Sequence, residues 1–123
     1  QAGISFDDYR YRVQRLGESI QIIKGLLTDT AVTFQGQHYS ITNMRGHPAP
    51  IQKPHPPIMI GGARRQMLSL AAREADIVAF ATKVFPDGRH DFTDSTGPAI
   101  ARKRAWVEET AGRRFAALEF HIH

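Results

Sequence analysis

Residues 58–80 constrain the fold of this chain more than any other part of the sequence. A short apolar run, Ile58–Ile60, predicts a strand buried on both faces, and the glycine pair that follows is expected to end it. Apolar residues then recur at spacings of three and four, which predicts a helix, and a second apolar run follows at Ile77–Phe80. Strand, helix and strand with short links predict a parallel βαβ unit with a right-handed crossover.

This unit also predicts where a ligand would bind. In parallel α/β folds, ligands bind beyond the carboxyl ends of the strands, where Gly61 and Gly62 open the helix. Glycine lets the backbone approach a ligand and adopt positive φ, the helix N-terminus favours phosphate, and Arg64 and Arg65 add positive charge. The spacing supports equally a tight Gly-Gly turn with solvated arginines. The dinucleotide fingerprint and the Walker pattern are both missing from the sequence.

The rest of the chain predicts a helix and a flap before this unit, and a helix and a strand after it. Within residues 1–30, an apolar stripe predicts a helix from Tyr9 to Leu27. Residues 31–57 read as a small hairpin or flap and a stiff proline connector. After Phe80 we expect a long loop with a turn at Pro86–Gly88, a helix near Ala99–Ala111, and an alternating strand at Ala117–His123. Residues 58–123 thus read as βαβαβ, and residues 1–123 as a single fragment.

Charge and composition narrow the possible partners. The net charge is +4, but the basic residues are scattered and aromatic residues do not alternate with them, so a solvated basic surface is favoured over nucleic-acid binding. Lys103 belongs to one such group, between two arginines. The absence of cysteine excludes disulfides and thiolate metal sites, and no apolar run approaches the roughly 20 residues of a membrane span. We therefore expect no membrane partner and a cytoplasmic location.

The strand near the C-terminus carries the one pattern that suggests a metal. Glu119, His121 and His123 alternate onto one face, an acceptable ligand set for a transition metal. A polar strand end explains the same pattern, and no other compact ligand set supports it, so we expect no metal site. His38 and His90 have no identifiable nucleophile partner, and no catalytic residue is assigned.

Several segments together resemble the luciferase-like monooxygenase family, above all its coenzyme F420-dependent oxidoreductase branch in actinobacteria. The similarity covers nearly the whole chain and is carried by RLGESIQIIKGLLTDTAVTFQGQHYSI, PAPIQKPHPPIMIGG, MLSLAAREADIV, PDGRHD and KRAWVEETAGRRF. The resemblance implies an α/β fold, namely part of a (β/α)8 TIM barrel, with the Ile58, Ile77 and Ala117 strands as about the fifth to the seventh. A complete barrel needs about 250 residues, roughly twice this length.

The resemblance also implies a cofactor site for FMN or coenzyme F420 at the strand ends. Ile60, Gly61 and Gly62 match the strand end that approaches the flavin or its phosphate tail. Relatives usually continue with more glycines and a proline, where this chain has Ala63 and Arg64, and Arg64 compensates by charge. Thr82 and Lys83 follow the next strand and line the same opening.

These observations leave three functional expectations. The first is a segment of a flavin- or deazaflavin-dependent oxidoreductase or monooxygenase, which binds a flavin-type cofactor and a small-molecule substrate in the full-length protein and lacks catalysis alone. The second is a non-catalytic half-barrel whose open strand edges pair in a homo-oligomer or with the missing barrel half. The third is a small phosphate-ligand module built on the Gly61-Gly62 loop.

Overall fold

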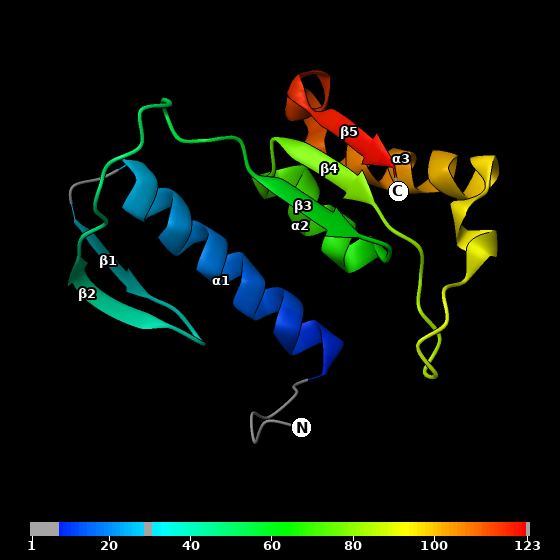
Figure 1. Cartoon of the computed structure of the whole chain (residues 1–123), viewed down its shortest axis with the longest axis horizontal. Helices are drawn as coiled ribbons and strands as arrows, with labels where there is room; N and C mark the ends of the chain where they lie inside the picture. Colours follow the sequence, from blue (N-terminus) through cyan, green and yellow to red (C-terminus); the bar gives the residue numbers. More distant parts are fainter. Residues whose placement is uncertain (1–7, 29–30, 123) are drawn as a thin grey trace. The chain divides into compact units, whose positions relative to one another are not determined.

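The computed structural model describes residues 8–28 and 31–122, which fall into two compact units, Gln1–Pro56 and Pro57–His123. His123, the third candidate ligand of the Glu-x-His-x-His pattern, lies outside the described residues. Each unit is described by itself, with the elements labelled as in Figure 1. No helix among the described residues is long and apolar enough to cross a membrane.

The first unit consists of one helix and one hairpin. Helix α1 (Tyr9–Thr28) lies where the apolar stripe predicts it and buries Val13 and Ile20. Strands β1 (Val32–Gln35) and β2 (Ser40–Met44) pair antiparallel, which confirms the predicted hairpin, and residues 45–58 contain no helix or strand. Helix α1 approaches β1 so closely that a Cβ atom on Gly25 would lie 2.9 Å from a methyl group of Val32.

One carboxylate connects the hairpin to α1. The Glu18 side chain accepts hydrogen bonds from the backbone N–H of Gln37 at 2.5 Å and of His38 at 2.8 Å. The His38 ring in turn packs edge-on against Tyr11, with 6.4 Å between the ring centroids. The turn of the hairpin is therefore anchored on the helix, and His38 takes part in the packing of this unit.

The second unit is a parallel three-stranded sheet with its helices. Strands β3 (Met59–Gly62), β4 (Ile77–Phe80) and β5 (Glu119–Ile122) lie side by side in the order β3-β4-β5 (Figure 1). Helix α2 (Arg65–Glu74) links β3 to β4. Helix α3 (Gly97–Ala111), preceded by the 3₁₀ turn η1 (Phe92–Ser95) and followed by η2 (Gly112–Ala117), links β4 to β5. This is the predicted βαβαβ order.

The prediction that the glycines end the first strand is wrong. Strand β3 begins at Met59 and continues through both glycines, because Gly61 pairs with Ala79 and Gly62 with Phe80 in the parallel ladder. Neither glycine has positive φ, so the expected left-handed conformation is also wrong. Their presence at this strand end requires another explanation, and contacts with neighbouring side chains provide one for Gly62.

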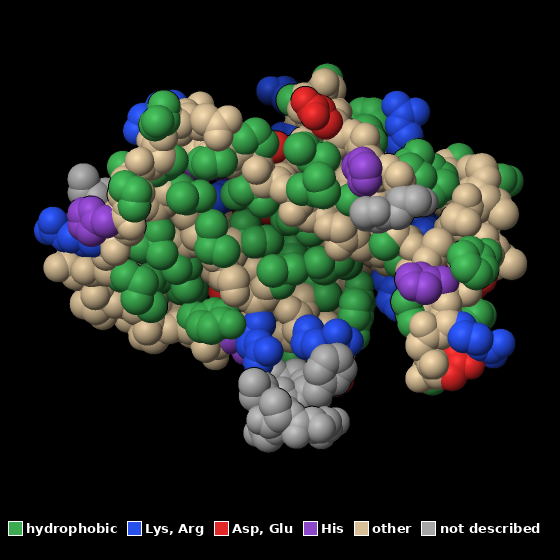
Figure 2. Space-filling model, in the orientation of Figure 1, with side chains coloured by type: hydrophobic (Ala, Val, Ile, Leu, Met, Phe, Trp, Pro, Cys, Tyr) green, Lys and Arg blue, Asp and Glu red, His purple; other side chains and the backbone are tan. Residues whose placement is uncertain are grey.

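The two faces of the sheet have different surroundings. A Cβ atom on Gly62 would point at α2, so alternate residues on that face meet the helices and form the core. That core contains Ile60, Leu68, Val78, Phe80 and Val107, and the ring of Phe80 stacks on Phe120. On the opposite face Met59 is 54% exposed. Hydrophobic side chains are accordingly visible at the molecular surface (Figure 2).

The segment after β4 is more ordered than the predicted long loop. Val84 and His90 form an antiparallel bridge, and Phe85 donates its backbone N–H to the carbonyl of Arg89 at 2.8 Å. The turn between them lies where the Pro-Asp-Gly sequence predicts it, with Gly88 at φ 87°. The chain thus leaves β4, reverses at this turn, and returns to η1, where Asp94 accepts a hydrogen bond from the backbone N–H of Lys83.

Candidate functional site

The predicted site residues lie together at the carboxyl ends of β3 and β4. The two strands end in register, and the backbone N–H of Ala81 donates to the carbonyl of Gly62 at 2.9 Å. This bond joins the residue that follows β4 to the last residue of β3. Ala63, Arg64, Thr82 and Lys83 therefore extend from the same edge of the sheet. Ile60 lies further back, with its side chain in the core.

The two glycines at this edge differ in whether their surroundings leave room for a side chain. A Cβ atom on Gly62 would lie 2.6 Å from Cγ and 3.0 Å from Cβ of Met67, so the packing of α2 on β3 requires glycine there. A Cβ atom on Gly61 would meet only Ala79, at 3.6 Å or more, which is ordinary van der Waals contact. Packing therefore explains Gly62 and leaves Gly61 unexplained.

The N-terminus of α2 and its arginines add positive character to this edge. Arg64 is the N-cap residue in an extended conformation, and its side chain makes no capping hydrogen bond. The first backbone N–H groups of a helix have no acceptor within the helix, which favours an anion nearby. Arg65 instead forms an exposed ion pair with Glu109 at 3.2 Å and lies over the ring of Trp106. Within residues 8–28 and 31–122, Arg64 is the one of the two predicted arginines that forms no ion pair.

Beside the same edge lies a buried ion pair that the sequence pattern did not predict. Lys103 is fully buried and donates from Nζ to Asp94 Oδ2 at 2.6 Å, to the Asp94 carbonyl at 2.9 Å and to the Ala81 carbonyl at 2.8 Å. The expectation that Lys103 belongs to a solvated basic surface is wrong. Its spacing gives the reason, since Lys103 lies four residues after buried Ala99 and four before buried Val107, on the inner face of α3.

The surroundings of Asp94 set its protonation state. Burial alone would raise the pKa of this carboxyl group, but the hydrogen bonds from Lys103 and from the backbone N–H of Lys83, with the charges of both lysines, lower the pKa below its usual value. Arg102 adds a weaker contact at 3.9 Å. Asp94 is therefore ionised when the protein is folded near neutral pH.

Acid should destabilise the second unit through Asp94. Because the folded-state pKa is depressed, the pair contributes its full stability above the unfolded carboxyl pKa of about 3.9 and loses it as the pH falls through the folded value. Urea unfolding followed from about pH 6 to pH 3 should show a steeper loss for the native sequence than for the double variant K103M/D94L. Equal slopes for the two proteins would contradict this assignment.

A second polar pair lies in the segment that follows β4. The Thr82 hydroxyl and the Nδ1 atom of His90 are 2.8 Å apart, because the loop reverses at the Pro-Asp-Gly turn and brings the two residues opposite each other. From the sequence, His90 has no identifiable partner. The sequence feature that could have revealed this partner is the Pro-Asp-Gly turn. A tight turn brings the segments before and after it side by side, so residues eight apart, such as Thr82 and His90, become neighbours.

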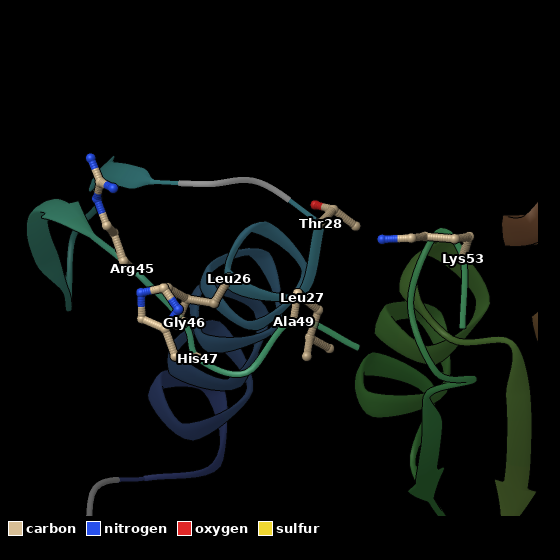
Figure 3. A pocket seen from close by; sticks show the side chains of 8 residues that line it. All are labelled: Leu26, Leu27, Thr28, Arg45, Gly46, His47, Ala49 and Lys53. Carbon is tan, nitrogen blue, oxygen red and sulfur yellow. The ribbon is translucent and has the colours of Figure 1, made fainter. Parts of the chain in front are cut away.

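Other candidate sites receive little support. In the part of the chain that the structure describes, no group of three or more His, Asp or Glu side chains lies close enough together to hold a metal ion. In the first unit, a pocket of about 280 Å³ lies between the end of α1 and the proline connector. Figure 3 shows its Arg45 and Lys53 side chains at opposite sides of the labelled group, so these basic groups do not converge on one ligand.

Comparison with known proteins agrees with this fold. Residues 2–116 match the family model described as luciferase-like monooxygenase. The FMNH2-dependent dimethylsulfone monooxygenase of Pseudomonas putida is 38% identical over 69 residues, which is 56% of this chain and 18% of that protein.

Two solved structures extend the match to nearly the whole chain. An EDTA monooxygenase from Chelativorans sp. BNC1 superposes with a TM-score of 0.73 at 13% identity, over 98% of this chain and 31% of that one. An F420-dependent secondary alcohol dehydrogenase in complex with an F420-acetone adduct gives a TM-score of 0.71 at 14% identity, over 98% and 34%. The chain therefore spans about a third of the length of these structures and has the fold of a partial TIM barrel. It belongs to the luciferase-like monooxygenase family.

Proposed function

We propose that this chain is the cofactor-binding section of an oxidoreductase or monooxygenase that uses FMN or coenzyme F420. The relatives named above include one protein that depends on FMNH2 and one that depends on F420. When bound, such a cofactor supplies the redox chemistry, either hydride transfer or oxygen activation on a small-molecule substrate. The chain by itself is expected to lack catalysis, because it spans only part of its relatives.

The observation that supports this proposal most is that a Cβ atom would fit at Gly61 in ordinary contact with Ala79, so packing does not require glycine there. Gly61 lies at the carboxyl end of a parallel strand, and packing leaves it free to carry a Cβ atom, so this position is suited to the close approach of a ligand. The uncapped N-terminus of α2 and the Arg64 guanidinium would hold the phosphate group, and Thr82 and Lys83 would contact the ligand from the other side. The departure from the glycine-rich family pattern at Ala63 makes the charge of Arg64 more important.

The substitution Gly61→Ala tests this role. The methyl group has room, so the fold should remain intact, but it would occupy the surface that the cofactor approaches and weaken binding about tenfold, which corresponds to roughly 1.4 kcal/mol. FMN and coenzyme F420 are each titrated into the labelled chain, and the amide resonances of residues 61–64 and 82–83 are followed by NMR. Gly97→Ala is the matched control, because a Cβ atom there meets nothing within 4 Å. Unchanged affinity in Gly61→Ala, or no shifts in the native sequence, would contradict the proposal.

The unpaired outer strands of the sheet, β3 and β5, favour a second function. Among the described residues, β3 and β5 each pair with β4 alone, so one edge of each outer strand has no partner strand. Such edges favour pairing with another strand. The chain would then act as a non-catalytic half-barrel that associates with a second copy or with the rest of a barrel. Native mass spectrometry of the purified chain should show dimers or larger species, whereas a monomer at all concentrations would count against it.

A further inference from the structure

The buried pair of Lys103 and Asp94 lies directly beneath the residues that follow β4. We propose that the two side chains are positioning residues for the cofactor site, because they hold residues 81–83 in the conformation that presents Thr82 and Lys83 to the ligand. The identity of the ligand rests on the proposed function. The contacts themselves do not depend on that proposal.

The contacts around Lys103 are complete. An ammonium group has three donors, and Lys103 uses them on three acceptors: the Ala81 carbonyl, the Asp94 carbonyl and Asp94 Oδ2, all within 2.9 Å. These acceptors belong to two segments, the residue after β4 and the turn η1. One side chain of α3 thus joins both segments.

Thr82 lies between two residues whose backbones are fixed. The Ala81 N–H donates to the Gly62 carbonyl and the Ala81 carbonyl accepts from Lys103. The Lys83 N–H donates to Asp94 Oδ2 at 2.9 Å, and the Lys83 carbonyl accepts from the Asp91 N–H at 2.8 Å. Two of these four bonds depend on the buried pair. The direction in which Thr82 and Lys83 face therefore depends on it as well.

A charged pair is a costly way to fill this position if stability is its only purpose. Well-packed apolar residues of similar volume often stabilise a protein as much as a buried ion pair does. An apolar pair, however, offers no directional bonds to the Ala81 carbonyl and the Lys83 N–H. The specific contribution of Lys103 and Asp94 is thus the geometry of residues 81–83, which border the proposed site.

The test compares the native sequence with K103M/D94L, a double variant that removes both charges together and keeps the volume filled. The control R89M/D87L makes matched changes in the exposed ion pair of the same loop. Amide hydrogen exchange and NMR titrations with FMN and with coenzyme F420 are measured on all three. In K103M/D94L we expect the Lys83 amide to lose about tenfold in protection while Val78 and Ala79 keep theirs. Cofactor-induced shifts should fall at residues 82–83 and persist at residues 61–64.

Four other outcomes of this experiment would contradict the inference, and each identifies a different cause. Unchanged protection at Lys83 would show that the pair does not hold this segment. Lost protection with undiminished shifts at residues 82–83 would show that the pair is structural only. If the native sequence shows no shifts with either cofactor, the proposed function fails and the positioning role fails with it. If R89M/D87L behaves like K103M/D94L, the effect belongs to the loop in general.

Discussion

Lys103→Met is expected to lower the free energy of unfolding by about 3–5 kcal/mol, because it leaves the Asp94 carboxylate buried with its main partner removed. The Ala81 and Asp94 carbonyls lose their donor at the same time. Methionine fills much of the space of the lysine stem, so the loss reports on polar contacts more than on volume. Urea unfolding of the whole chain, followed by circular dichroism, measures it.

A double-mutant cycle shows whether the pair acts as a unit. In a background that already carries Asp94→Leu, the change Lys103→Met should cost far less, because no buried carboxylate remains to be compensated. Arg102→Met is the control, since Arg102 is 53% exposed on its side chain and lies 3.9 Å from the same carboxylate. Its cost should stay below about 1 kcal/mol. Equal costs for Lys103→Met and Arg102→Met would contradict the role of the buried pair.

The local sequence pattern predicted most helices and strands, because the spacing of their apolar residues matches the face that each element buries. The apolar stripe of α1, the four-residue run of β4 and the stop of α3 at Gly112 all depend on neighbours in sequence. The extent of β3 does not. Its last two residues are strand because β4 supplies the hydrogen-bonding partners, and no local signal distinguishes an extended glycine from a turn glycine.

For the candidate site, too, the location could be predicted from the sequence, but the contacts that shape it could not. The prediction that the carboxyl ends of β3 and β4 meet at one edge of the sheet is confirmed, because parallel topology brings them together, although β3 continues through the two glycines that were expected to end it. The contacts that shape the site come from residues distant in sequence: Asp94 and Lys103 from beyond the loop, and Met67 against Gly62. Lys103 in particular resembles its exposed neighbours in residue type, and only its spacing between Ala99 and Val107 places it inside. Charge by itself misassigns such a residue.

In the first unit, Gly36→Ala should destabilise the hairpin by about 2 kcal/mol, because it displaces the Glu18 carboxylate from two backbone N–H groups. A Cβ atom on Gly36 would overlap Glu18 Oε1 and would lie 2.6 Å from Glu18 Cδ and from the Phe34 ring. Gly36 does not have positive φ, so close approach and not backbone conformation requires the glycine. Amide exchange at Gln37 and His38 reports the loss directly.

The partner substitution separates this explanation from a general effect of the added methyl group. Glu18→Ala should destabilise the hairpin by a similar amount, and Gly36→Ala added to Glu18→Ala should cost less than about half of what it costs alone, since both changes remove the same two hydrogen bonds. Gly97→Ala, where the methyl group meets nothing within 4 Å, should be nearly neutral. Additive costs for Glu18 and Gly36 would mean that the glycine serves the packing of Phe34 alone. A non-additive pair would show that one carboxylate, nineteen and twenty residues away from the amides it binds, fixes the hairpin on α1.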